Sequence, residues 1–299
     1  MKMKTSKQQA TVGVIGGSGL YNIEGLTSTR SIRVRTPFGV PSDAITLGTL
    51  EGIRVAFLSR HGQGHLLNPS GINYRANIFA LKSLGVSHVI SISAVGSMKE
   101  SIRPGDVVIP DQFIDLTKRR PSTFFENGIV AHVAFGEPVC AELGQALCSS
   151  AKHVGATVHP RGTYLCMEGP QFSTKAESQL YRQWGVDVIG MTNMPEAKLA
   201  REAELSYATV ALVTDYDCWH ETEEAVTVEA VLATLHRNVA LAKQILRAAM
   251  PAFTGLGSCT CHRALENAIL TAPKRIPAAV RKRLAVLIDR ALRPQKGAR

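Results

Sequence analysis

The sequence predicts an α/β fold, in which one large domain is followed by a basic, helical C-terminal extension. Short runs of apolar and β-branched residues alternate with helix-like patterns along most of the chain, and this alternation is typical of α/β proteins. No repeat, low-complexity linker or other boundary interrupts residues 40–250. A chain of 299 residues is long enough to bury a sizeable core in one such domain.

The expected strands are short apolar runs that end in polar residues or glycines. They lie at Thr11–Ile15, Ala44–Leu50, Arg54–Ser59, His88–Ser93, Asp106–Ile109, Thr163–Met167, Asp187–Met191 and Tyr207–Thr214. The expected helices lie at Asn73–Leu84, Pro138–Val154, Thr174–Gln183, Pro195–Ala203 and Val228–Met250. Two more helices are expected in the basic tail, at Cys261–Leu270 and Pro277–Leu292.

The net charge of +10 is concentrated at the two ends of the chain. We divide the chain into an N-terminal arm at residues 1–10, a domain at 11–253, and an extension at 254–299 with ten basic and two acidic residues. Because the domain itself is close to neutral, we expect a solvated, amphipathic extension and no nucleic-acid partner. A nucleic-acid-binding module that uses the tail is the alternative from a different class, and its affinity would depend strongly on salt.

Composition and cysteine usage indicate the compartment. No apolar run is long enough to span a membrane, and the polar start MKMKTSKQQA does not resemble a secretory signal, so we expect a cytoplasmic protein. In that reducing compartment the six cysteines are expected to be free thiols. Only Cys259 and Cys261 are closely spaced, and no second pair lies at a zinc-like spacing. A disulfide involving this pair is the alternative.

The first strand ends in the loop VIGGSGL, residues 14–20. A dinucleotide-binding loop needs a third glycine that is absent here, and a P-loop needs a Gly-Lys-Ser/Thr that does not follow. A tight glycine turn with the hydroxyl of Ser18 instead suits a small tetraoxyanion held by backbone N–H groups. Other strand ends add further donors, namely Arg60, His61, Ser93 and Thr192. One arginine and several hydroxyls fit orthophosphate better than a triphosphate.

Asp215 and Asp217 follow the last expected strand, with their side chains expected on one face. Such a pair can bind a divalent metal, act as the two carboxyls of a glycosidase, or accept hydrogen bonds from the amino group of a base. No further ligands at a recognisable metal spacing lie nearby, and the two glycines between His61 and His65 argue against a metal-binding helix, so we expect no metal. Recognition of the amino edge of adenine fits a neighbouring phosphate site best.

Several ordered motifs together resemble the purine nucleoside phosphorylase superfamily: GVIGGSGL, TPFGVPS, LSRHGQGHLLNPSGINYRAN, SAVGSMKESIRPGDVVIPDQFID, EGPQFSTKAES and GMTNMPEAKLAREAELSYATVALVTDYDCW. The most similar branch is that of the 5′-methylthioadenosine phosphorylases. The resemblance implies a central mixed, partly barrel-like sheet flanked by helices. It also implies a homo-oligomer, either a trimer or a dimer of trimers, with sites at subunit interfaces.

The resemblance also assigns a site to residues of this sequence. The phosphate-binding residues that it implies are Ser18, Arg60, His61, Ser93, Ala94 (through its backbone) and Thr192. The nucleoside-binding residues that it implies are Phe172 stacked on the base, Met191 under the sugar, Asp215 and Asp217 at the N7 and 6-amino edge, and His65, Val228 and Val231 around the 5′-alkylthio group. Asp215 and Asp217 are also the implied catalytic residues.

The implied activity is the phosphorolysis of 5′-methylthioadenosine to adenine and 5-methylthioribose 1-phosphate, in purine and methionine salvage. Relatives that prefer 6-oxopurines carry Glu and Asn where this chain has Ser173 and Asp215, and an ionised carboxylate accepts only from a 6-amino group. Orthophosphate is the implied co-substrate, and it attacks C1′ through an oxocarbenium-like transition state without a metal or other cofactor. A methylthioinosine or general purine nucleoside phosphorylase is the alternative. Arg60 argues against a hydrolase, because a water nucleophile has no use for it.

Overall fold

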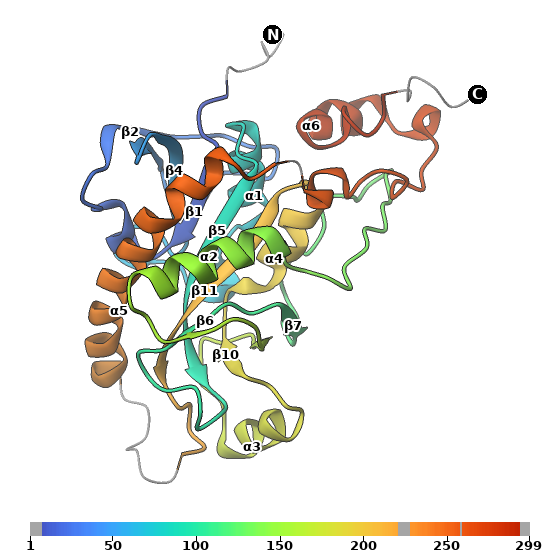
Figure 1. The fold of residues 1–299 in the computed structure, drawn as a ribbon. Coiled ribbons are helices and arrows are strands. Elements are labelled where there is room, and N and C mark those ends of the chain that lie inside the picture. The colour runs from blue at the N-terminus through green and yellow to red at the C-terminus, as the bar shows by residue number, and fades with distance from the viewer. Residues whose placement is uncertain (1–7, 221–227, 258, 294–299) are drawn as a thin grey trace.

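The computed structural model describes residues 8–220, 228–257 and 259–293, which form a single α/β domain. Its centre is a mixed sheet of eleven strands, with helices packed on both faces (Figure 1). Across these residues, no helix is long and apolar enough to cross a membrane.

The sheet is built around one long strand, β5 (His88–Ser97). The other strands are β1 (Val12–Gly16), β2 (Thr27–Ile32), β3 (Ile45–Leu50), β4 (Ile53–Ser59), β6 (Val107–Val108), β7 (Gln112–Asp115), β8 (Val158–His159), β9 (Thr163–Cys166), β10 (Val188–Gly190) and β11 (Ser206–Asp215). The strand order is β2-β3-β4-β1-β5-β10-β9-β7, and a branch at β5 adds β11, β6 and β8. Since β4, β1, β5 and β11 are parallel to their neighbours in this part of the sheet, their carboxyl ends meet along one edge.

Two hydrophobic clusters cover the two faces of the sheet. Side chains alternate between them along a strand, so that Val12 and Val14 of β1 join one cluster and Ile15 joins the other. The first cluster packs against α2 (Ala141–His153) and α5 (Val228–Ala249), and the second against α1 (Tyr74–Ser83), α4 (Asn193–Glu202) and α6 (Ala278–Ile288). The short α3 (Lys175–Gln183) lies beyond the end of β5 and begins with a capping box between Thr174 and Glu177 (Figure 1).

The eight expected strands and the five helices expected before residue 251 are confirmed, with ends that differ by a few residues. Three strands were not expected. β2 is polar and mostly exposed and has no apolar alternation, β7 is a short, half-buried strand at the end of the strand order, and β8 has only two residues.

The helix expected at Cys261–Leu270 is wrong. A single 3-10 turn forms at Thr260–Arg263, Asn267 takes a positive φ of 62°, and Ile269 bridges to Ala131. Cys261, Leu265 and Ala268 are buried, whereas Leu270 is exposed. The local backbone bonds are short-range turns, and the end of the segment pairs with a neighbouring loop: the His132 N–H donates to the Ala268 carbonyl and the Leu270 N–H donates to the Val130 carbonyl.

The second helix of the extension is confirmed as α6, and it is docked on the domain. Val280, Leu284 and Ile288 are buried against the cluster that α1 shares. Beyond α6, Arg290 Nε donates to the buried carboxylate of Glu204 at 2.8 Å. The extension is therefore not a free basic arm. Its boundary with the domain, placed at residue 253, stays a prediction.

Candidate active site

One residue in the middle of β5, Ala94, is open to solvent, and we call the space above it the hollow at Ala94. Nine of the ten residues of this strand are buried, but Ala94 is exposed between the buried Ser93 and Val95. An exposed alanine within a buried strand indicates that the space above it is not filled by side chains of the protein. The hollow lies where the carboxyl ends of the neighbouring strands meet, which is where ligands bind in open α/β sheets.

Two other strands bring their ends to this hollow. β10 runs antiparallel to β5 with Ile189 opposite Gly96, so that Met191 and Thr192, which follow β10, continue toward Ala94. β11 runs parallel to β5 and ends with Asp215 opposite Gly96. The register therefore brings five of the predicted site residues close together, at the ends of β10 and β11 and in the facing part of β5: Ser93, Ala94, Met191, Thr192 and Asp215.

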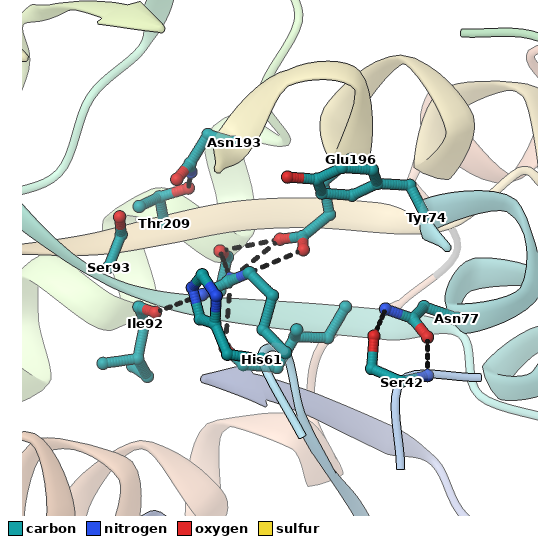
Figure 2. Close-up of polar contacts among 12 residues, drawn as sticks. Ser42, His61, Tyr74, Asn77, Ile92, Ser93, Asn193, Glu196 and Thr209 are labelled. Atoms are coloured by element: carbon teal, nitrogen blue, oxygen red, sulfur yellow. Dashed lines mark hydrogen bonds and ion pairs between the residues drawn. The ribbon is translucent and has the colours of Figure 1, made fainter. Parts of the chain in front are cut away.

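Arg60 follows β4, and its guanidinium is buried in an ion pair with Glu196 of α4. Figure 2 labels Glu196 and draws the polar contacts of its carboxylate as dashed lines. Arg60 Nε donates to Glu196 Oε2 at 2.9 Å and Nη2 donates to Oε1 at 3.0 Å. Nη2 also donates to Ser91 Oγ at 2.6 Å, and Nη1 donates to the Ile92 carbonyl at 2.9 Å. These bonds leave one N–H of Nη1 without an acceptor in the described part of the chain. The edge of the guanidinium that carries Nε and Nη2 is thus bonded to Glu196. Arg60 therefore offers a phosphate only one N–H, on Nη1.

His61 is neutral and faces a ligand as an acceptor. Its Nδ1 lies 2.8 Å from the Leu67 carbonyl, and because a carbonyl only accepts, Nδ1 carries the proton and Nε2 is bare. Burial, with a smaller contribution from the charge of Arg60, lowers the pKa of His61 to about 4. In this structure His61 therefore presents an acceptor at Nε2, whereas the sequence-based expectation is a donor, and its role toward phosphate stays a prediction. The ring stacks on that of the exposed His65, with centroids 4.1 Å apart.

Ser93 and Thr192 contribute buried hydroxyls. Ser93 Oγ lies 3.2 Å from Tyr164 Oη, and Thr192 precedes α4 without making a side-chain capping bond. The same Tyr164 hydroxyl fills the space beside Gly190, where an added Cβ would lie only 1.9 Å from it. Tyr164 therefore fixes the position of Ser93 relative to the end of β10, while the hydroxyl of Thr192 is not used as a helix cap.

Asp215 and Asp217 lie together over Gly96. A Cβ at Gly96 would lie 2.8 Å from Asp215 Oδ1 and 3.4 Å from Asp217 Cβ, so only glycine leaves room for the pair. Asp217 is held beside Asp215 because its backbone N–H donates to Asp215 Oδ1 at 2.8 Å, with Asp217 at a positive φ of 55°, and not because of strand alternation. Burial raises the pKa of Asp217. Gly96 is three residues along β5 from Ser93, a separation of about 10 Å in a strand.

The predicted base-stacking residue, Phe172, is half exposed, at 52%. It precedes Ser173, whose carbonyl accepts a hydrogen bond from Cys218 Sγ at 3.3 Å, and this bond ties the segment to the loop of Asp217. Met191 lies across from Gly169, where an added Cβ would meet its Sδ at 2.5 Å. An exposed aromatic ring beside a carboxylate pair is a suitable platform for a purine base.

Three predicted residues lie partly outside the described structure. Ser18 begins a 3-10 turn, Ser18–Tyr21, directly after β1, and Val228 and Val231 lie in the first turn of α5. The side chains of all three are outside the described residues, so their contacts stay predictions.

The comparisons with known proteins agree with this geometry. A family model described as the phosphorylase superfamily matches residues 11–251. The chain belongs to this superfamily. It is 57% identical to the S-methyl-5′-thioadenosine phosphorylase of Geobacter sulfurreducens over 94% of its own length and 98% of that protein, and 55% identical to that of Koribacter versatilis, over 96% and 99%.

Solved structures of the superfamily share this fold. A methylthioadenosine phosphorylase from an antarctic soil metagenomic library superposes with a TM-score of 0.90 at 50% identity, covering 94% of this chain and 99% of the other. The methylthioadenosine phosphorylase of Schistosoma mansoni in complex with adenine superposes with a TM-score of 0.80 at 34% identity, covering 94% and 98%.

This phosphorylase superfamily member also uses site residues that the sequence did not reveal. Arg120, 8% exposed, donates from Nη1 to the carbonyls of Met191 and Met194 at 2.7 Å each, and from Nη2 to that of Glu168 at 2.6 Å. It thereby holds the backbone on both sides of Thr192. Glu196 was likewise missed. A carboxylate on a helix that packs into the core indicates that the residue has a buried cationic partner. The sequence does not indicate which arginine or lysine that partner is.

Proposed function

We propose that this protein is a 5′-methylthioadenosine phosphorylase, which converts 5′-methylthioadenosine and orthophosphate to adenine and 5-methylthioribose 1-phosphate. The observation that carries the proposal is the carboxylate pair Asp215–Asp217 over Gly96, about 10 Å along β5 from Ser93. This separation suits a nucleoside whose base lies at the pair and whose C1′ faces a phosphate beside Ser93. The names of the full-length relatives give independent support.

In this proposal phosphate occupies the hollow at Ala94. Its ligands are the hydroxyls of Ser18, Ser93 and Thr192, the free N–H of Arg60 and the backbone of Ala94. His61 accepts a hydrogen bond through its bare Nε2 from a phosphate oxygen that carries a proton or from a sugar hydroxyl. The charges of Arg60 and Glu196 cancel, so neutral donors supply most of the binding.

The nucleoside lies between this hollow and the loop of Asp217. Phe172 stacks on adenine, Met191 lies under the ribose, and His65, Val228 and Val231 line the 5′-methylthio group. Asp215 and Asp217 bind the N7 and 6-amino edge. Burial raises the pKa of Asp217, which makes this carboxyl easier to protonate than an exposed one.

The reaction then needs no covalent intermediate. Phosphate attacks C1′ from the face opposite the base while the glycosidic bond breaks, and its negative charge stabilises the oxocarbenium-like ribosyl group. The negative charge that develops on adenine is relieved by the proton of the Asp215–Asp217 pair at N7. Orthophosphate is the co-substrate, and no metal or other cofactor takes part in this scheme.

The remaining assignments rest on the composition of the chain and on its resemblance to this family. We propose a cytoplasmic enzyme of purine and methionine salvage that assembles as a trimer or a dimer of trimers. The 5′ end of the nucleoside would then be covered in part by a neighbouring subunit.

The decisive experiment is adenine release from 5′-methylthioadenosine with and without phosphate, with methylthioinosine and inosine as parallel substrates. Release that requires phosphate and is specific for the aminopurine is expected. Release without phosphate would identify a hydrolase and overturn the phosphate site. Cleavage of the 6-oxo substrates instead would retain the phosphate site and overturn the base assignment. The variant Asp215→Asn separates these outcomes, because an amide can donate to a 6-oxo group.

A further inference from the structure

Three cysteines from distant parts of the chain meet in the core, away from the strand ends described above. Cys140 lies immediately before α2, and Cys259 and Cys261 lie in the extension. Their Sγ atoms all lie within 4.8 Å of one another, and those of Cys140 and Cys259 are 3.3 Å apart. The three side chains are at most 7% exposed. The sequence had shown only a two-residue pair, because Cys140 is 119 positions from Cys259.

The spacing of the sulfur atoms matches a metal site. Zinc–thiolate bonds are about 2.3 Å long, so two sulfurs on one tetrahedral ion lie about 3.8 Å apart. The separations here, from 3.3 Å to at most 4.8 Å, bracket that value. We propose that Cys140, Cys259 and Cys261 bind one thiophilic d¹⁰ metal ion, such as Zn²⁺, through three thiolates.

The surroundings offset the charge of such a site. Three thiolates and a divalent ion leave one negative charge, and Cys140 sits at the positive end of the 13-residue helix α2. The Cys261 backbone N–H donates to Cys259 Sγ at 3.2 Å, and the guanidinium of Arg201 acts on Cys261 electrostatically. Each thiol releases its proton to solvent as its S–metal bond forms, and no electron is transferred.

The hydroxyl of Ser206 lies next to the Cys140 thiol and is the candidate for the fourth ligand. Ser206 is fully buried, and its Oγ lies 3.0 Å from His262 Nε2. The bound ion would link α2 to the extension, so we expect it to stabilise the docking of residues 259–293 and to leave the active site unchanged.

The test is a titration of the reduced, metal-free full chain with Cd²⁺, a spectroscopic substitute for Zn²⁺, followed by the thiolate-to-cadmium charge-transfer absorbance. One equivalent per chain is expected to saturate the band. Each of Cys140→Ser, Cys259→Ser and Cys261→Ser should weaken the apparent affinity at least about tenfold, since even the loss of a residue that only orients a ligand costs about 10- to 100-fold. Cys148→Ser is the matched control, since Cys148 is also a buried cysteine of α2 but lies outside the cluster, and it should bind as the wild type does.

A second measurement needs no variant. In the native wild type, one equivalent of Zn²⁺ should protect Cys140, Cys259 and Cys261 together from a thiol-alkylating reagent, as counted by peptide mass spectrometry. Equal Cd²⁺ binding by the four variants and the wild type, or protection that does not include all three cysteines, would overturn the proposal. Far-ultraviolet circular dichroism of each metal-free variant shows whether a lost band reflects a lost ligand or a lost fold.

Discussion

The buried ion pair between Arg60 and Glu196 gives the sharpest prediction. Glu196 is fully buried, and its carboxylate accepts four hydrogen bonds, two from Arg60 and one each from Ser91 Oγ and Tyr207 Oη. In the variant Glu196→Gln, the amide N–H₂ must face at least one of these donors, and Arg60 is left buried without a countercharge. Breaking a buried pair in this way costs about 3–5 kcal/mol. We therefore expect the free energy of unfolding to fall by that amount.

Glu202→Gln is the matched control, on the same helix. Glu202 is 6% exposed and accepts hydrogen bonds from the Phe124 N–H and Thr123 Oγ1, but has no cationic partner among the described residues. Burial raises the pKa of Glu202 to about 7, so at pH 6 it is mostly neutral and an amide resembles it. One lost hydrogen bond should cost only about 1 kcal/mol.

The assay is urea unfolding of both variants at pH 6, together with the KM for phosphate in the phosphorolysis reaction. Glu196→Gln should also lower that KM at least about tenfold, since Arg60 then lacks its countercharge and one charge-assisted contact to phosphate contributes about 1.4 kcal/mol or more. If the two variants unfold within about 0.5 kcal/mol of each other, the ion pair does not hold Arg60 and the reasoning fails. If stability falls but the KM does not change, Arg60 stabilises the fold and does not bind phosphate.

Further predictions address the base, the end of β10 and the pH dependence. Asp217→Asn should lower kcat/KM for methylthioadenosine about 100- to 10,000-fold with little change in unfolding, since an amide has nearly the same shape as the carboxyl but cannot transfer its proton; an unchanged kcat/KM would remove Asp217 from the mechanism. Gly190→Ala should displace the Tyr164 hydroxyl and destabilise by about 1–3 kcal/mol in thermal unfolding, whereas Gly136→Ala, with open space around it, should not. Because the pKa of Glu202 is higher in the folded than in the unfolded state, the free energy of unfolding should fall by about 3 kcal/mol as pH rises from 4.5 to 7, and Glu202→Gln should abolish this part of the slope.

The sequence predicted the strands that carry the site because those strands are buried and apolar, and burial leaves a strong hydrophobic pattern. It did not predict β2, whose side chains face solvent. It also predicted a helix at Cys261–Leu270, where the structure has a bridge between Ile269 and Ala131. Such outcomes depend on which distant segment lies alongside, which no local pattern encodes.

The same limit applies to the site. The positions of the hydroxyl-bearing residues at the ends of buried strands could be predicted, since a polar residue at such a place has few structural roles. The partner of Arg60 could not, because Glu196 lies 136 residues away. The state of His61 could not either, since it depends on the carbonyl of Leu67 and on burial.

These two missed features change the electrostatics of the proposed mechanism. With Arg60 offset by Glu196 and His61 neutral, the hollow at Ala94 carries little net positive charge of its own. Neutral hydroxyls and N–H groups can orient a phosphate dianion without cancelling its field. The full negative charge then acts on the ribosyl ring as it becomes cationic, which is the contribution that phosphorolysis requires of the nucleophile. An arginine that bound phosphate through two N–H groups would stabilise the ground state and would also cancel part of the negative charge of the phosphate. Substrate binding would then be tighter without a matching gain in rate.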